Sequence, residues 1–88
     1  MDKQEDLFPT EVKLDGVAAS RRIHYLVTHR LARLDTDESG WETLYRDPQD
    51  SRLWEHTYPH SGMHGGGPPA LHVISPQAAA AKYGAFTA

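Results

Sequence analysis

Three histidines stand at a spacing that could serve metal chemistry. His56, His60 and His64 are four residues apart, which on a helix would bring three imidazoles, a common zinc ligand, to one face. Pro59 and Gly62 disfavour that helix, so the rings would have to meet in a loop, and the sequence marks no fourth ligand. We therefore predict no metal cofactor, and keep a small metal- or anion-binding module in loop 56–67 as the alternative function.

A run of glycines follows the last of these histidines. His64-Gly65-Gly66-Gly67 is similar to the oxyanion loop of lipases and esterases, in which glycine N–H groups stabilise a developing negative charge. An esterase also needs a Gly-x-Ser-x-Gly nucleophile elbow, which this sequence lacks. Because two prolines come next, the glycines instead predict a tight reversal of the backbone or a nest of N–H groups that binds an anion.

Other catalytic patterns are also missing from the sequence. It has no glycine-rich phosphate loop, no carboxylate pair in an identifiable pocket, and no Ser or Thr with a marked base. It has no cysteine, so disulfides and thiolate chemistry are excluded, as is typical of a reducing compartment. We predict that the protein is not an enzyme.

The length of 88 residues allows one domain, since domains run to roughly 100–200 residues. Residues 1–11 are polar and charged and are predicted to form a flexible tail, which leaves 12–88 as the single domain. The acidic N-terminus is followed by no apolar run, so we expect neither a signal peptide nor a membrane helix. These features predict a soluble protein of the cytoplasm.

Charge is distributed unevenly along the chain although the total is only −3. Residues 17–34 contain four arginines and no acid, whereas residues 35–55 contain seven acids and two arginines. Such asymmetry bears on association rather than on fold. A solvated surface is the simpler interpretation, and an acidic patch that meets a basic partner is the alternative. The aromatic segment is the acidic one, unlike in proteins that bind single-stranded nucleic acid.

The elements that must position these residues are a helix and three or more strands. Apolar residues at helical spacing from Ile23 to Leu34 predict a helix near 21–34, and alternation around Asp15-Gly16 predicts a short hairpin over 12–17. Residues 41–46 and 52–58 are rich in aromatic and β-branched types around the turn residues 47–51, which predicts a hairpin.

The face assignment of this hairpin depends on its register. If Arg46 lies opposite Arg52, large aromatic residues fall on both faces of the hairpin. A two-stranded ribbon covered by one helix would be polar on its other face. We therefore expect either a second cover or a surface for a partner.

The C-terminal part predicts a third strand over 70–74 and a short helix over 76–83. Ser75 is placed to cap this helix, Pro76 suits its first position, and Gly84 suits the residue after its last turn. The whole chain is therefore expected to be an α+β domain, with a small antiparallel sheet packed by two helices.

Several short motifs follow one another between residues 20 and 84. They are Ser39-Gly40-Trp41-Glu42-Thr43-Leu44-Tyr45-Arg46-Asp47-Pro48, Trp54-Glu55, Thr57-Tyr58-Pro59 and Met63-His64-Gly65-Gly66-Gly67-Pro68-Pro69. Their order resembles the bacterial family named immunity protein 27, with His-Gly-Gly-Gly-Pro-Pro as its most specific part. Two positions depart from the family pattern: Ser51 stands where Gly is usual, and Gly62 where an acidic residue is common.

The resemblance implies an antidote, encoded beside a polymorphic toxin, that binds a cognate toxin domain and blocks its active surface. If that toxin is a nuclease, its basic site would suit the acidic segment; nucleic acid and membranes are not implied as partners. The candidate toxin contacts are Asp35, Asp37, Glu38, Glu42, Asp47, Asp50, Trp54, Glu55 and Tyr58. The family-motif loop comprises His64, Gly65, Gly66, Gly67, Pro68 and Pro69.

Overall fold

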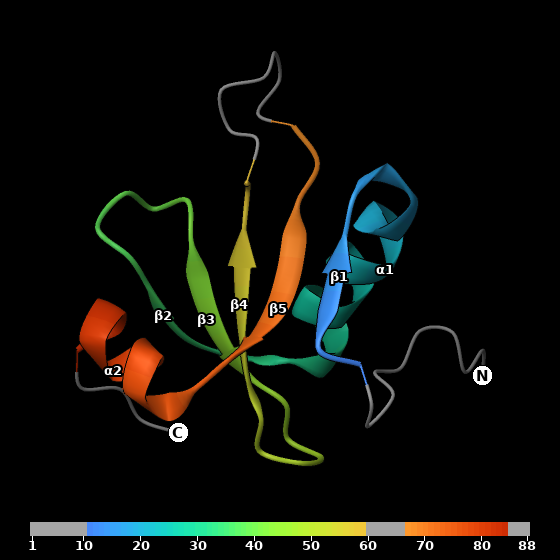
Figure 1. Ribbon diagram of the computed structural model, residues 1–88. Helices are drawn as coiled ribbons and strands as arrows, with labels where there is room; N and C mark the ends of the chain where they lie inside the picture. Colours follow the sequence, from blue (N-terminus) through green and yellow to red (C-terminus); the bar gives the residue numbers. More distant parts are fainter. Residues whose placement is uncertain (1–10, 60–66, 85–88) are drawn as a thin grey trace.

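Five strands form one antiparallel sheet in the computed structural model, which describes residues 11–59 and 67–84. The elements in chain order are β1 (Lys13–Asp15), the 3-10 turn η2 (Val17–Ala19), α1 (Ser20–Tyr25), its π-helical continuation η3 (Leu26–Arg30), β2 (Ala32–Thr36), β3 (Thr43–Arg46), β4 (Leu53–Thr57), β5 (Ala70–Ile74) and α2 (Pro76–Tyr83). Across the sheet the strand order is β1–β5–β4–β3–β2 (Figure 1). The predicted α+β class is therefore confirmed.

The helix predicted near 21–34 ends at Arg30, so its last part was wrongly assigned. Leu31 leaves the helix with an extended ψ of 144°, and β2 then pairs with β3. Leu31 packs in the cluster under α1, whereas Leu34 packs in the cluster under α2 on the other face of the sheet. Residues on one side of a helix cannot reach both faces of the sheet. Along an extended chain, side chains alternate between the two faces, so Leu31 and Leu34 point to opposite ones.

The predicted hairpin around Asp15-Gly16 is also wrong. Strand β1 lies at the edge of the sheet and pairs with β5, so that Leu14 faces Leu71. Gly16 has a φ of 85°, a left-handed conformation that glycine adopts without strain. It turns the chain into η2 and α1 instead of into a second strand.

The hairpin of β3 and β4 is confirmed, but its register differs by one residue from the predicted one. Arg46 lies opposite Leu53, not Arg52, and Tyr45 lies opposite Trp54. Because side chains alternate along a strand, a shift of one residue moves a whole strand's side chains to the other face. The aromatic side chains of both strands consequently share one face.

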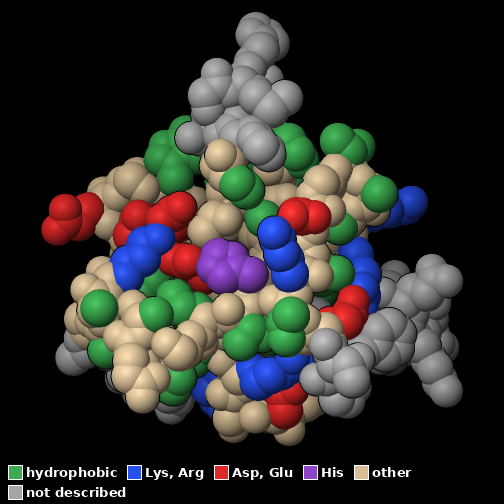
Figure 2. Space-filling view, in the orientation of Figure 1, with side chains coloured by type: hydrophobic (Ala, Val, Ile, Leu, Met, Phe, Trp, Pro, Cys, Tyr) green, Lys and Arg blue, Asp and Glu red, His purple; other side chains and the backbone are tan. Residues whose placement is uncertain are grey.

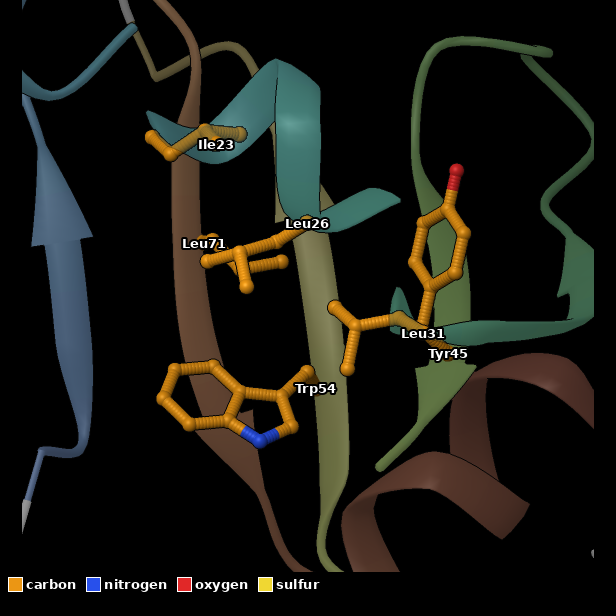
Figure 3. Packing of buried hydrophobic residues seen from close by; sticks show 6 residues of the cluster. All are labelled: Ile23, Leu26, Leu31, Tyr45, Trp54 and Leu71. Carbon is orange, nitrogen blue, oxygen red and sulfur yellow. The ribbon is translucent and has the colours of Figure 1, made fainter. Parts of the chain in front are cut away.

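One helix covers each face of the sheet. The segment α1–η3 covers the aromatic face, where the buried residues are Ile23, Leu26, Leu31, Tyr45, Trp54 and Leu71 (Figure 3). Helix α2 covers the opposite face, where Leu44, Leu53 and Ala79 are buried. The expectation of a second cover rested on aromatic residues on both faces, which the observed register contradicts. The second face is nevertheless covered, by α2, because it carries Leu44 and Leu53.

Helix α2 begins and ends where the sequence predicts. The Ser75 hydroxyl accepts a hydrogen bond from the backbone N–H of Ala78 at 3.1 Å, and Pro76 occupies the first helical position. Gly84 follows the last turn with a φ of 74°. Neither α2 nor any other helix in the described ranges is long and apolar enough to cross a membrane.

Candidate partner-binding surface

The structure divides the predicted acidic contacts between three places. Those on or beside the β2–β3 turn are Asp35, Asp37, Glu38 and Glu42. Asp47 and Asp50 belong to the β3–β4 turn, at the opposite end of the sheet (Figure 1). Glu55 lies in the middle of β4, on the face that α2 covers. These acids lie at both ends of the sheet and in its middle. We therefore do not expect all of them to belong to one interface with a partner.

Asp37 holds the β2–β3 turn together. Its Oδ1 accepts hydrogen bonds from the Ser39 hydroxyl at 2.7 Å, from the Gly40 N–H at 3.1 Å and from the Glu42 N–H at 3.3 Å. The hydrogen bond from Ser39 is the main reason that the pKa of Asp37 lies below its usual range. The carboxylate of Asp37 therefore shapes the turn, while the exposed side chain of Glu38 has no ion-pair partner among the described residues.

The β3–β4 turn uses its acids in the same way. Asp47 is 6% exposed, and its side chain accepts a hydrogen bond from the Gln49 N–H at 2.9 Å. Asp50 is exposed and accepts from both the backbone N–H and the guanidinium of Arg52. Asp47 thus serves the turn, whereas Asp50 keeps a side chain that a partner could reach.

Glu55 is a buried carboxylate that anchors α2 to the sheet. The residue is 5% exposed; its Oε2 accepts a hydrogen bond from the Tyr83 hydroxyl at 2.7 Å and lies 2.6 Å from Lys82 Nζ, and its Oε1 lies 3.0 Å from His72 Nε2. Lys82 also pairs with Glu42. Figure 2 shows acidic side chains gathered beside basic ones on this face, with a histidine near its centre.

The pKa of Glu55 reflects these contacts. Burial raises the pKa of the carboxyl, but hydrogen bonds from Lys82 and Tyr83 and the charges of Lys82 and His72 outweigh burial. The net pKa of Glu55 therefore lies below its ordinary value. Together with its burial, this makes Glu55 part of the internal structure rather than an open contact.

The aromatic candidates also separate into a core residue and a surface residue. Trp54 is 0% exposed in the cluster under α1 (Figure 3), so its ring offers no area to a partner. Tyr58 is half-buried and meets Trp41 edge to face, with ring centroids 5.5 Å apart. Trp41 is 55% exposed. Sequence reasoning did not select Trp41, and the correct register would have shown it opposite Tyr58 at the end of the hairpin.

His56 belongs to the same row of rings. Its imidazole lies edge to face with Tyr58 at 5.1 Å and with Tyr45 at 6.5 Å between ring centroids. Burial lowers the pKa of His56 below its ordinary value. Trp41, Tyr58, His56 and Tyr45 form what we call the aromatic row.

The family-motif loop is described only in its last part. Gly67, Pro68 and Pro69 lead into β5, and the two prolines line a shallow pocket of about 680 Å³ with Lys13, Asp15 and His72. The predicted loop residues His64, Gly65 and Gly66 lie outside the described residues, as does His60. The described residues hold no group of three metal-ligating side chains, and His56 is packed in the aromatic row.

The fold and this distribution of charged and aromatic residues define a small α+β protein with an acidic turn at one end of its sheet. The family model of immunity protein 27 matches residues 10–75, about three quarters of the chain, and the chain belongs to that family. No curated protein and no solved structure matches it. Helix α2 follows the matched range, whereas Trp41, Tyr58 and the β2–β3 turn lie inside it.

Proposed function

We propose that this protein binds the catalytic domain of a cognate bacterial toxin in the cytoplasm and blocks the toxin's active surface by occupying it. Membership of an immunity family supports a toxin as the partner. The mechanism proposed is binding alone, without turnover of the toxin or of any small molecule.

The surface proposed for this contact is the acidic end, which we define as Asp35, Asp37, Glu38, Glu42 and Trp41. The observation that carries it is the 55% exposure of Trp41, a large aromatic side chain in the same turn as the exposed Glu38. Aromatic anchors surrounded by polar residues are typical of the centres of protein interfaces. The opposite end of the sheet offers the polar turn 47–51 without such an anchor.

We propose further that the toxin is one with a basic active site, and a nuclease fits this description. Complementary charge speeds the encounter of two proteins and makes their association sensitive to salt. The acidic end would then cover the basic residues that hold the substrate's phosphates. The dissociation constant is expected to rise when the salt concentration is raised.

Two charge reversals test which end of the sheet binds. Glu38→Lys and Asp50→Lys each change the charge by two units on an exposed side chain, at opposite ends of the molecule. We expect Glu38→Lys to weaken binding of the toxin domain about tenfold, as for a lost interfacial charge contact of about 1.4 kcal/mol, and Asp50→Lys to leave binding nearly unchanged.

The measurement is titration calorimetry with the domain encoded beside this gene, after thermal unfolding has shown that both variants fold. If Asp50→Lys weakened binding and Glu38→Lys did not, the interface would lie at the β3–β4 turn instead. Absence of binding by the unaltered protein would contradict the proposed function itself.

A further inference from the structure

The exposed indole of Trp41 packs against the other rings of the aromatic row. The Trp41 and Tyr58 rings meet at an interplanar angle of 88°, the Tyr58 and His56 rings at 83°, and the His56 and Tyr45 rings at 90°. Tyr45 is 9% exposed and belongs to the core under α1. The row therefore connects the surface indole to the core through a series of edge-to-face contacts, which are favourable arrangements for aromatic rings.

The backbone at Trp41 is fixed as well. Its N–H donates to the Ser39 hydroxyl oxygen at 3.0 Å, and the Ser39 hydroxyl donates to Asp37 at 2.7 Å. The next residue, Glu42, donates its N–H to Asp37 at 3.3 Å. Because ring and backbone are both restrained before a partner arrives, binding at Trp41 costs little conformational entropy.

The turn that carries this indole is rich in acids. Asp37 and Glu38 belong to the turn itself. Asp35, which lies opposite Leu44, and Glu42, which pairs with Lys82 of α2, flank it on the other face of the sheet. The face of an indole ring is itself the most attractive aromatic surface for a cation. An indole that is 55% exposed and the exposed carboxylate of Glu38 therefore belong to the same turn.

We propose that Trp41 receives an arginine side chain of the toxin, whose guanidinium stacks on the indole while Glu38 and its neighbours balance the charge. This inference rests on the proposed function and names the chemistry of the partner at that site. Arginine fits better than lysine because its planar, weakly hydrated guanidinium stacks on aromatic faces. A neutral side chain of similar shape on the same indole would lack the attraction between the cation and the ring.

The first test needs no toxin. The chain has two tryptophans, so nuclear magnetic resonance distinguishes the exposed Trp41 indole from the buried Trp54 indole. N-acetylarginine methylamide is titrated to about 0.2 M, since an exposed cation–π pair is weak, against the citrulline analogue at matched ionic strength. We expect the Trp41 signal to shift with the arginine compound, with a smaller shift for citrulline and an unmoved Trp54 signal. Equal shifts with both compounds, or no shift of Trp41, would overturn the inference.

The second test uses the toxin domain and two substitutions at the same position. Trp41→Leu is expected to weaken toxin binding about tenfold, and Trp41→Phe to give an intermediate affinity, because phenyl is a weaker cation acceptor than indole. Binding by the unaltered protein together with unchanged affinity of Trp41→Leu would overturn this inference and leave the proposed function standing. Failure of the unaltered protein to bind would instead contradict the proposed function.

Discussion

At the scale of single residues, carboxylates that look alike in the sequence have different tasks in the structure. Glu55 is enclosed and bonded to three side chains, Asp37 and Asp47 hold turns, and Glu38 is exposed to solvent. Burial and hydrogen bonding, rather than charge alone, decide which acids a partner can use. Substitutions at these residues therefore test either the fold or the interface, and seldom both.

Replacing Glu55 should affect stability much more than replacing Glu42. Hydrogen bonds to a buried charged group contribute about 1.5–3 kcal/mol, so Glu55→Gln is expected to lower the free energy of unfolding by about 2 kcal/mol. Glu42→Gln removes a partly exposed ion pair and should cost at most about 1 kcal/mol. Urea unfolding at pH 7 measures both, and equal losses would show that Glu55 does not anchor α2.

The contacts of Glu55 should also make the stability of the protein depend on pH in the acidic range. The folded protein lowers the pKa of Glu55, so the unfolded chain binds its proton more readily. The stability that this carboxylate contributes is present above its ordinary pKa of 4.5 and is lost as the pH falls through its lower folded pKa. The slope of stability against pH below 4.5 should be shallower in Glu55→Gln than in the unaltered protein.

His56 gives a second pH dependence at higher pH. Burial lowers its folded pKa below 6.5, so the neutral imidazole is the form that the aromatic row accommodates. Stability should be greatest above pH 6.5 and fall as the pH drops below that value towards the folded pKa. Urea unfolding at pH 7.5 and 5.5 should show a smaller difference for His56→Gln, and a midpoint of His56 above 6.5 by magnetic resonance would contradict the assignment.

At the scale of elements, the β3–β4 turn holds one residue in a conformation that suits another residue type. The φ of Ser51 is 65°, the left-handed conformation that favours glycine, which is the residue that the resemblance leads us to expect there. Its N–H donates to the Asp47 carbonyl at 2.8 Å. The turn therefore places a serine in a conformation that a side chain disfavours.

Ser51→Gly should stabilise the protein. Relief of the left-handed conformation is worth about 1–2 kcal/mol, and the greater freedom of glycine in the unfolded chain offsets part of it, which leaves a gain of about 0.5–1 kcal/mol. Ser39→Gly in the β2–β3 turn is the control, since it removes hydrogen bonds to Asp37 and Trp41 and should destabilise. A loss of stability in Ser51→Gly would mean that the serine side chain contributes to the turn.

At the scale of the whole molecule, local signals predicted most elements, and long-range pairing decided the rest. Patterns of neighbouring residues predict the cap of α2, strand β5 and the hairpin of β3 and β4, and all three are confirmed. The edge strand β1 pairs with β5, more than fifty residues away, which no local pattern indicates. The residues of β2 were predicted as the end of a helix, because the spacing of Leu31 and Leu34 is compatible with a helix as well as with a strand. Only their pairing with β3 distinguishes the two.

The candidate surface was only partly predictable for the same reason. The acidic segment is visible in the sequence, but a shift of one residue in the hairpin register decides which aromatic side chain is exposed. That shift places Trp54 in the core and leaves Trp41 as the exposed aromatic residue beside the acidic turn. Register depends on the whole sheet and its two covering helices, so it is a property of the molecule rather than of the hairpin.

The most direct measurement is a titration of the toxin's activity with this protein. The catalytic domain encoded by the neighbouring gene is held at a concentration well above the dissociation constant, and its initial rate is followed as the protein is added. If the protein acts by occupying the toxin, activity should fall linearly and vanish at a fixed stoichiometric ratio, and should return when the two are separated. Complete inactivation by a small fraction of an equivalent, or activity that persists at full occupancy, would contradict the account.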